Sequence, residues 1–110
     1  IEHAESVENI DAILGIAGVD AAFIGPYDLS ASMGITAQFD HSDYLEAERR
    51  ILEGCRRHGV AAGIHVVPPE PGLVLQRIAE GYRLIAYSLD ITMVSEASAK
   101  LMRALHAEQG

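Results

Sequence analysis

Apolar residues recur along the chain in two different patterns, one typical of helices and one typical of buried strands. Helical spacing marks the segments 3–16, 42–58, 71–80 and 92–106, with a brief helix after Pro26. Short continuous apolar runs, typical of buried strands, occupy 19–25, 60–67 and 83–89. A glycine precedes each run (Gly18, Gly59 and Gly81), where a left-handed residue reverses the chain without a Cβ penalty. The pattern predicts one continuous array of alternating helices and strands.

This alternation is typical of parallel α/β architecture. A doubly wound open sheet and a (β/α)8 barrel produce the same local pattern, so periodicity alone leaves both open. Three strands are few for a self-contained sheet, whose edges would need protection, and a whole barrel needs about 250 residues. In either fold, ligands gather where the parallel strands end. Those positions are Glu2, 25–28, His65 and 89–90.

The charge of the chain narrows its classes of partner. Its 110 residues carry 8 basic and 16 acidic side chains, a formal net charge of −8, and such a surface repels phosphate backbones. We therefore expect no nucleic-acid partner. No run approaches the roughly 18 consecutive apolar residues of a membrane helix, and the single cysteine, Cys55, excludes an internal disulfide. These features favour a cytoplasmic protein without membrane contact.

Two carboxylates follow candidate strand ends. Ile1 could be the last residue of a strand, which places Glu2 at its carboxyl end, and Asp28 follows the run 19–25. Carboxylates at adjacent strand ends point into the same mouth and could share a divalent cation. Ligation by oxygen alone favours Mg²⁺ or Mn²⁺ over Zn²⁺. The alternative is that Asp28 only caps a helix and that Glu2 is solvated.

The segment Gly25-Pro26-Tyr27-Asp28-Leu29-Ser30 offers a second function at the same place. Glycine lets a ligand come close to the backbone, and free N–H groups at the start of the following helix suit a small carboxylate. The competing interpretation is a plain tight turn with proline at the first helical position.

These segments also carry a family resemblance. The stretch IGPYDLSASMG, preceded by IEHAESVENIDAI and GVDAAF and followed by GIHVV, resembles the metal-dependent (class II) pyruvate aldolases of the HpcH/HpaI type. These are the 4-hydroxy-2-oxoheptanedioate and 2-dehydro-3-deoxyglucarate aldolases of the phosphoenolpyruvate/pyruvate-binding barrel superfamily. The resemblance implies an α/β fold, the carboxyl-terminal portion of a (β/α)8 TIM barrel with about three strands and four main helices. Residues 1–110 would form a single partial domain with no internal boundary.

The resemblance also implies a chemistry. Glu2 and Asp28 match the family's two metal-ligand positions, with Mg²⁺ the first choice and Mn²⁺ or Co²⁺ as alternatives. Gly25, Tyr27 and Asp28 match the turn whose N–H groups hold the substrate carboxylate. The implied reaction cleaves a 4-hydroxy-2-oxo acid to pyruvate and an aldehyde through a metal-stabilised enolate. A Schiff-base aldolase would need a lysine at the active face, but the only lysine, Lys100, lies deep in the last predicted helix.

His65 departs from the family pattern, in which an apolar residue follows Gly-Ile on this strand. We expect His65 to bind the substrate, either at the oxygen of the aldehyde part or as a third group near the metal. A partly buried histidine satisfied by a backbone carbonyl is the alternative.

Some of the family's machinery belongs to earlier strands of the barrel. Its substrate-binding arginine and its histidine–aspartate acid/base pair have no counterpart here, and helix arginines such as Arg77 are expected to face away from the strand ends. No catalytic residue beyond the metal ligands is therefore expected in this chain, and the isolated chain should be inactive. Barrels of this superfamily often exchange their last helix between protomers, which implies a homo-oligomer. The alternative functions are a citrate-lyase-β-like lyase of the same superfamily and a non-catalytic α/β binding or assembly module.

Overall fold

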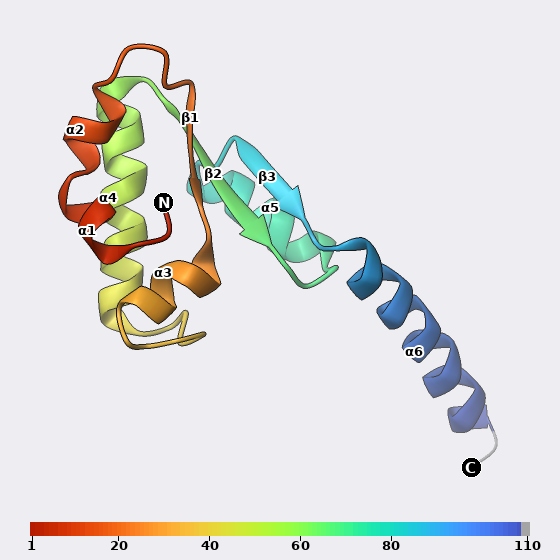
Figure 1. The fold of residues 1–110 in the computed structure, drawn as a ribbon. Helices are drawn as coiled ribbons and strands as arrows, with labels where there is room; N and C mark the ends of the chain where they lie inside the picture. The colour runs from red at the N-terminus through yellow and green to blue at the C-terminus, as the bar shows by residue number, and fades with distance from the viewer. Residues whose placement is uncertain (109–110) are drawn as a thin grey trace.

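The computed structural model describes residues 1–108 as alternating helices and strands; the last two residues of the predicted domain lie outside this range. In chain order the elements are α1 (Ala4–Glu8), α2 (Ile10–Leu14), β1 (Ala21–Ile24), α3 (Pro26–Ser32), α4 (Ser42–His58), β2 (Ala61–Val66), α5 (Pro71–Glu80), β3 (Leu84–Tyr87) and α6 (Asp90–Glu108). Figure 1 shows α1 and α2 beside α4, and α6 extending away from the remaining elements.

The three strands form one parallel sheet in the order β1-β2-β3. In its register Ile24 pairs with Ile64. Ile1 extends this row beyond β1: its nitrogen donates to the carbonyl of Phe23 at 2.5 Å, and the N–H of Gly25 donates to the carbonyl of Ile1 at 3.2 Å. This is the pattern of hydrogen bonds between parallel strands. Ile1 thus pairs with β1 as a residue of a neighbouring parallel strand would.

One face of the sheet packs against the helices. Ile24 and Ile64 are almost fully buried and belong to the same core as Tyr44, Ile51 and Cys55 on the inner side of α4. Burial raises the pKa of the Cys55 thiol, so it stays protonated and serves packing, since a reactive cysteine needs its thiolate.

The opposite face carries Phe23, Gly63 and Leu84 in a second row. A Cβ on Gly63 would lie 2.7 Å from Phe23 Cδ2 and 3.2 Å from the Cβ of Leu84, so the neighbouring side chains leave room for glycine only. In a closed barrel this face is the interior, which is filled by layers of side chains from neighbouring strands.

The structure departs from the predicted pattern at two helices. The helix predicted over 3–16 is broken at Asn9, which ends α1 and begins α2. The Asn9 side-chain amide donates to the carbonyl of Glu5 at 3.0 Å, a local bond by which asparagine competes with regular helix. The last helix begins at Asp90, earlier than predicted, because the Asp90 carboxylate accepts the N–H of Ile91 at 2.7 Å.

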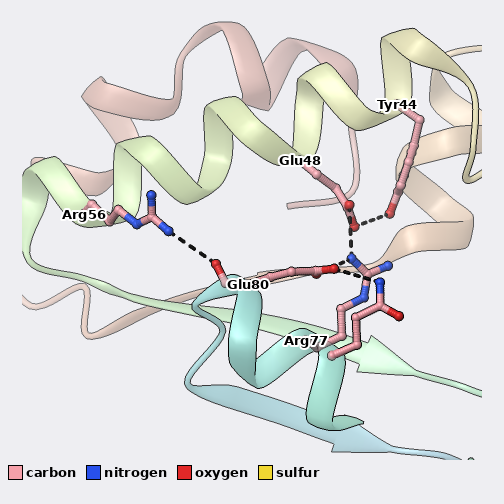
Figure 2. Close-up of polar contacts among 6 residues, drawn as sticks. Tyr44, Glu48, Arg56, Arg77 and Glu80 are labelled. Carbon is pink, nitrogen blue, oxygen red and sulfur yellow. Dashed lines mark hydrogen bonds and ion pairs between the residues drawn. The ribbon is translucent and has the colours of Figure 1, made fainter. Parts of the chain in front are cut away.

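A buried polar network joins α4 to α5 (Figure 2). Glu48, only 6% exposed, accepts the hydroxyl of Tyr44 at 3.0 Å and pairs with Arg77 at 3.2 Å. Arg77 also pairs with Glu80 at 2.9 Å. Burial, and then the charge of Glu48, raise the pKa of Tyr44, so its hydroxyl remains a donor. The network holds together the two helices that precede and follow β2.

The last helix leaves much of its apolar surface exposed. It projects from the other elements (Figure 1), and the molecule measures 59 × 28 × 22 Å. Its large exposed apolar side chains include Ile91, Val94, Leu101, Met102 and Leu105. Among residues 1–108, no helix combines the length and hydropathy needed to cross a bilayer.

Candidate functional site

Two carboxylates converge on Gly25, directly after β1. A Cβ built on this glycine would lie 3.1 Å from Glu2 Oε1 and 3.2 Å from Asp28 Oδ2. The two oxygens therefore border one small space, which is open only because residue 25 has no side chain. The two metal-ligand candidates from the sequence are thus brought together.

Strand register explains this convergence. Ile1 and Ile24 lie side by side, so the next residues, Glu2 and Gly25, are also neighbours, and strand alternation turns both to the face opposite the helical core. Asp28 reaches the same space from the first turn of α3, which begins at Pro26. Proline suits this position because its fixed φ matches the helix and it has no N–H to leave unpaired.

His65 belongs to the same row. Ile64 pairs with Ile24, so His65 lies beside Gly25 on the same face, one strand spacing of about 4.8 Å away. Its Nε2 lies 3.0 Å from the carbonyl oxygen of Ser88. A backbone carbonyl partner is what the alternative interpretation, a partly buried structural histidine, predicts. The second ring nitrogen, Nδ1, has no hydrogen bond in residues 1–108.

The turn after Gly25 presents backbone donors. The N–H of Leu29 donates to the carbonyl of Gly25 at 2.9 Å and begins the helical ladder. The N–H groups of Tyr27 and Asp28 come before it in the first turn, where no intrahelical acceptor exists. The ring of Tyr27 packs edge-on against Phe39, with ring centres 5.0 Å apart, which fixes its side chain on the loop that follows α3.

A cavity of about 210 Å³ lies next to this turn. Its lining includes Pro26, Tyr27, Phe39, His65, Pro68, Leu73 and Arg77. Arg77 also lines this cavity, although its guanidinium pairs with Glu48 and Glu80 between α4 and α5. It follows Leu73 by four residues and shares its face of α5.

The donor set at Gly25 suits a hard cation. Glu2 and Asp28 supply oxygen alone, and the space that a Cβ would fill lies between them. Mg²⁺ is commonly held by one or two carboxylates and completes its octahedron with water and substrate oxygens. Within residues 1–108 there is no group of three or more His, Cys, Asp or Glu side chains that could hold a metal, so the candidate centre has two protein ligands from this chain.

The only lysine is remote from this centre. Lys100 lies about 15 Å along α6 from Asp90, which follows the end of β3. Among residues 1–108, the side chains nearest the space at Gly25 are those of Glu2 and Asp28, not that of the lysine.

The chain is similar to known proteins of one family. The family model of the HpcH/HpaI aldolase/citrate lyase family matches residues 1–97. A hydroxypyruvate/pyruvate aldolase of Roseobacter denitrificans is 36% identical over 94 residues, which are 86% of this chain and 36% of that protein. A 2-keto-3-deoxy-L-rhamnonate aldolase of Salmonella paratyphi B is 37% identical over 101 residues, covering 88% of this chain and 36% of that protein.

A solved structure shows the same fold. An HpcH/HpaI aldolase/citrate lyase family protein from Burkholderia cenocepacia superposes with a TM-score of 0.90 at 32% identity, over 96% of this chain and 40% of that one. The chain thus spans little more than a third of the length of the curated relatives that it matches. Its three strands superpose on part of that larger structure. The chain belongs to the HpcH/HpaI aldolase/citrate lyase family.

Proposed function

We propose that the protein carrying this chain is a class II aldolase, which cleaves a 4-hydroxy-2-oxo acid to pyruvate and an aldehyde. The observation that supports this most directly is the convergence of Glu2 and Asp28 on Gly25 at the carboxyl ends of parallel strands. The two relatives that carry aldolase names support the reaction class.

In this proposal, Glu2 and Asp28 hold a divalent cation, Mg²⁺ first and Mn²⁺ or Co²⁺ as alternatives. When bound, the cation supplies Lewis acidity that stabilises negative charge on the keto oxygen of the 2-oxo acid. The free N–H groups of Tyr27 and Asp28, together with the open approach at Gly25, bind the substrate carboxylate. They neutralise its charge without adding a titratable cation to the site.

The reaction breaks the C3–C4 bond of the substrate. The proton leaves the 4-hydroxyl, the C4–O bond becomes a carbonyl, and the bonding pair of C3–C4 passes into the enolate of pyruvate, which is then protonated at C3. This chain positions the carboxylate and keto end of the substrate. We propose that the base for the hydroxyl proton lies in the remainder of the barrel, so residues 1–110 alone release little or no pyruvate.

The test is pyruvate release from a 4-hydroxy-2-oxo acid by the full-length protein with Mg²⁺ or Mn²⁺. We expect EDTA to abolish release and either cation to restore it. Asp28→Asn should lower kcat/KM by about 100-fold, since changes around metal ligands commonly cost 10- to 100-fold. Asp43→Asn is the matched control, because Asp43 occupies the first turn of α4 as Asp28 occupies that of α3. Unchanged activity in Asp28→Asn would refute the proposed site.

A second candidate function follows from the breadth of the family, whose model also covers citrate lyases. A citrate-lyase-β-like enzyme would use the same two carboxylates and would need a pocket for a thioester. Cleavage of a citryl thioester, with no turnover of 4-hydroxy-2-oxo acids, would favour this alternative. A non-catalytic binding or assembly module would show neither reaction.

We also propose that α6 packs on a second copy of the protein. Its exposed apolar side chains, Leu101 and Leu105 among them, support this, because such surface is normally buried. Sedimentation of the full-length protein tests it, and a strict monomer would contradict it. The cytoplasm is the proposed location, in keeping with Cys55 as a buried free thiol.

A further inference from the structure

Ser88, directly after β3, has an unusual backbone that serves His65. Its φ of 57° lies in the left-handed region, which costs free energy for a residue with a side chain. Its N–H donates to the carbonyl of Val66 at 2.7 Å, and its own carbonyl oxygen lies 3.0 Å from His65 Nε2. Ser88 is 6% exposed, and its hydroxyl has no partner in residues 1–108. The serine hydroxyl therefore does not explain the strained backbone. The strained conformation instead directs the Ser88 carbonyl toward His65 Nε2.

The carbonyl of Ser88 decides which ring nitrogen of His65 carries the proton. A carbonyl oxygen only accepts hydrogen bonds, so His65 Nε2 must be the donor. In a neutral imidazole the other nitrogen is then an acceptor only. The strained turn after β3 thus fixes a single tautomer, with Nδ1 as an acceptor.

The residue that carries this acceptor lies near the proposed reaction centre. His65 is beside Gly25 in the strand row, on the face that carries Glu2, and it also lines the 210 Å³ cavity next to Tyr27. Glu2 and Asp28, whose side chains lie nearest the space at Gly25, present further acceptors. A ligand group that meets His65 Nδ1 must therefore bring its own proton.

We propose that His65 is a specificity-determining residue that accepts a hydrogen bond from a hydroxyl group on the aldehyde part of the substrate. This inference rests on the proposed aldolase function. A carboxylate on the aldehyde would bring only acceptors to His65 Nδ1, and an unsubstituted aldehyde would leave Nδ1 unpaired. A 2-hydroxyaldehyde supplies the missing donor. One neutral hydrogen bond corresponds to a preference of about tenfold.

The test compares aldol addition of pyruvate to glycolaldehyde and to propanal, which replaces the hydroxyl by a methyl group. The measured quantity is the kcat/KM for glycolaldehyde divided by the kcat/KM for propanal, in the full-length protein. Comparing this ratio between variants removes the intrinsic reactivity of each aldehyde, because that reactivity is the same for every variant. We expect His65→Leu to lower the ratio about tenfold and His65→Gln, whose amide oxygen can accept, to retain part of it. Ser88→Gly keeps the carbonyl and should keep the ratio. His58→Gln is the control, since His58 contacts Asp11 and not the site.

The outcomes separate this inference from the proposed function. If the wild type and His65→Leu both add pyruvate with the same ratio of kcat/KM values for glycolaldehyde and propanal, the inference is overturned and the aldolase function stands. No addition to any aldehyde would overturn the aldolase function, and with it this role of His65. Nitrogen NMR of protein with ¹⁵N-labelled histidine adds a measurement that needs no turnover: we expect the neutral His65 ring to carry its proton on Nε2, and a proton on Nδ1 would overturn the inference.

Discussion

Gly25→Ala tests whether the space between the two carboxylates is used. The new Cβ would lie 3.0 Å from Glu2 Cγ, 3.1 Å from Glu2 Oε1 and 3.2 Å from Asp28 Oδ2, whereas ordinary contacts begin at 3.4 Å. Both side chains must therefore retreat by a few tenths of an ångström. Metal–ligand distances tolerate about 0.2 Å, so both donors would leave bonding range together.

The same substitution should leave the fold nearly unchanged. Gly25 has φ −92° and ψ 96°, which alanine adopts without strain. Replacing glycine at such a position stabilises by about 0.4–1 kcal/mol, and the tight contacts cost on the order of 1 kcal/mol. We therefore expect the free energy of unfolding of the metal-free protein to change by less than about 1 kcal/mol. The Kd for Mn²⁺ should rise 10- to 100-fold, the range found when the surroundings of metal ligands are disturbed.

The assay is calorimetric titration with Mn²⁺, accompanied by thermal unfolding with EDTA present. Gly72→Ala is the matched control, because a Cβ on Gly72 meets nothing within 4 Å and its place in α5 favours alanine. This control should raise Tm and leave the Kd unchanged. An unchanged Kd in Gly25→Ala would refute the reasoning that the space above Gly25 holds the cation.

Two further predictions concern the fold. Gly63→Ala should destabilise by about 1–3 kcal/mol, because its Cβ would lie 2.7 Å from Phe23 Cδ2 in a packed row; a denaturation midpoint equal to wild type would contradict this. Arg77→Met should also destabilise by about 3 kcal/mol, since it leaves the buried carboxylate of Glu48 without its cation, and the double variant Arg77→Met/Glu48→Gln should recover part of the loss. Equal urea midpoints for the single and double variants would show that the ion pair is not the cause.

Much of the fold could be predicted from sequence periodicity. The three strands lie within the predicted runs, and the glycines before them end helices in positive-φ conformations, as Gly59 and Gly81 show. These features depend on local steric preferences, which sequence patterns report well. The apolar spacing over 3–16 does not predict the break at Asn9, because the break comes from the hydrogen bond of the Asn9 side chain to the backbone carbonyl of Glu5.

The candidate site was predictable in part for a related reason. The ends of parallel strands meet at one edge, so the sequence alone predicts that Glu2, Asp28 and His65 lie at the same edge. The positive φ of Ser88 and its carbonyl contact with His65 could not be predicted, because they depend on a long-range pairing between β2 and β3. The position of Arg77 beside the cavity likewise depends on its pairing with Glu48 across two helices.

The most direct measurement of the central claim is anomalous diffraction at the manganese edge, from crystals of the full-length protein grown with Mn²⁺ and pyruvate. We expect one strong peak beside Gly25, bonded to carboxylate oxygens of both Glu2 and Asp28 at about 2.0–2.3 Å. A manganese peak at another site, with these two carboxylates unligated, would contradict the account.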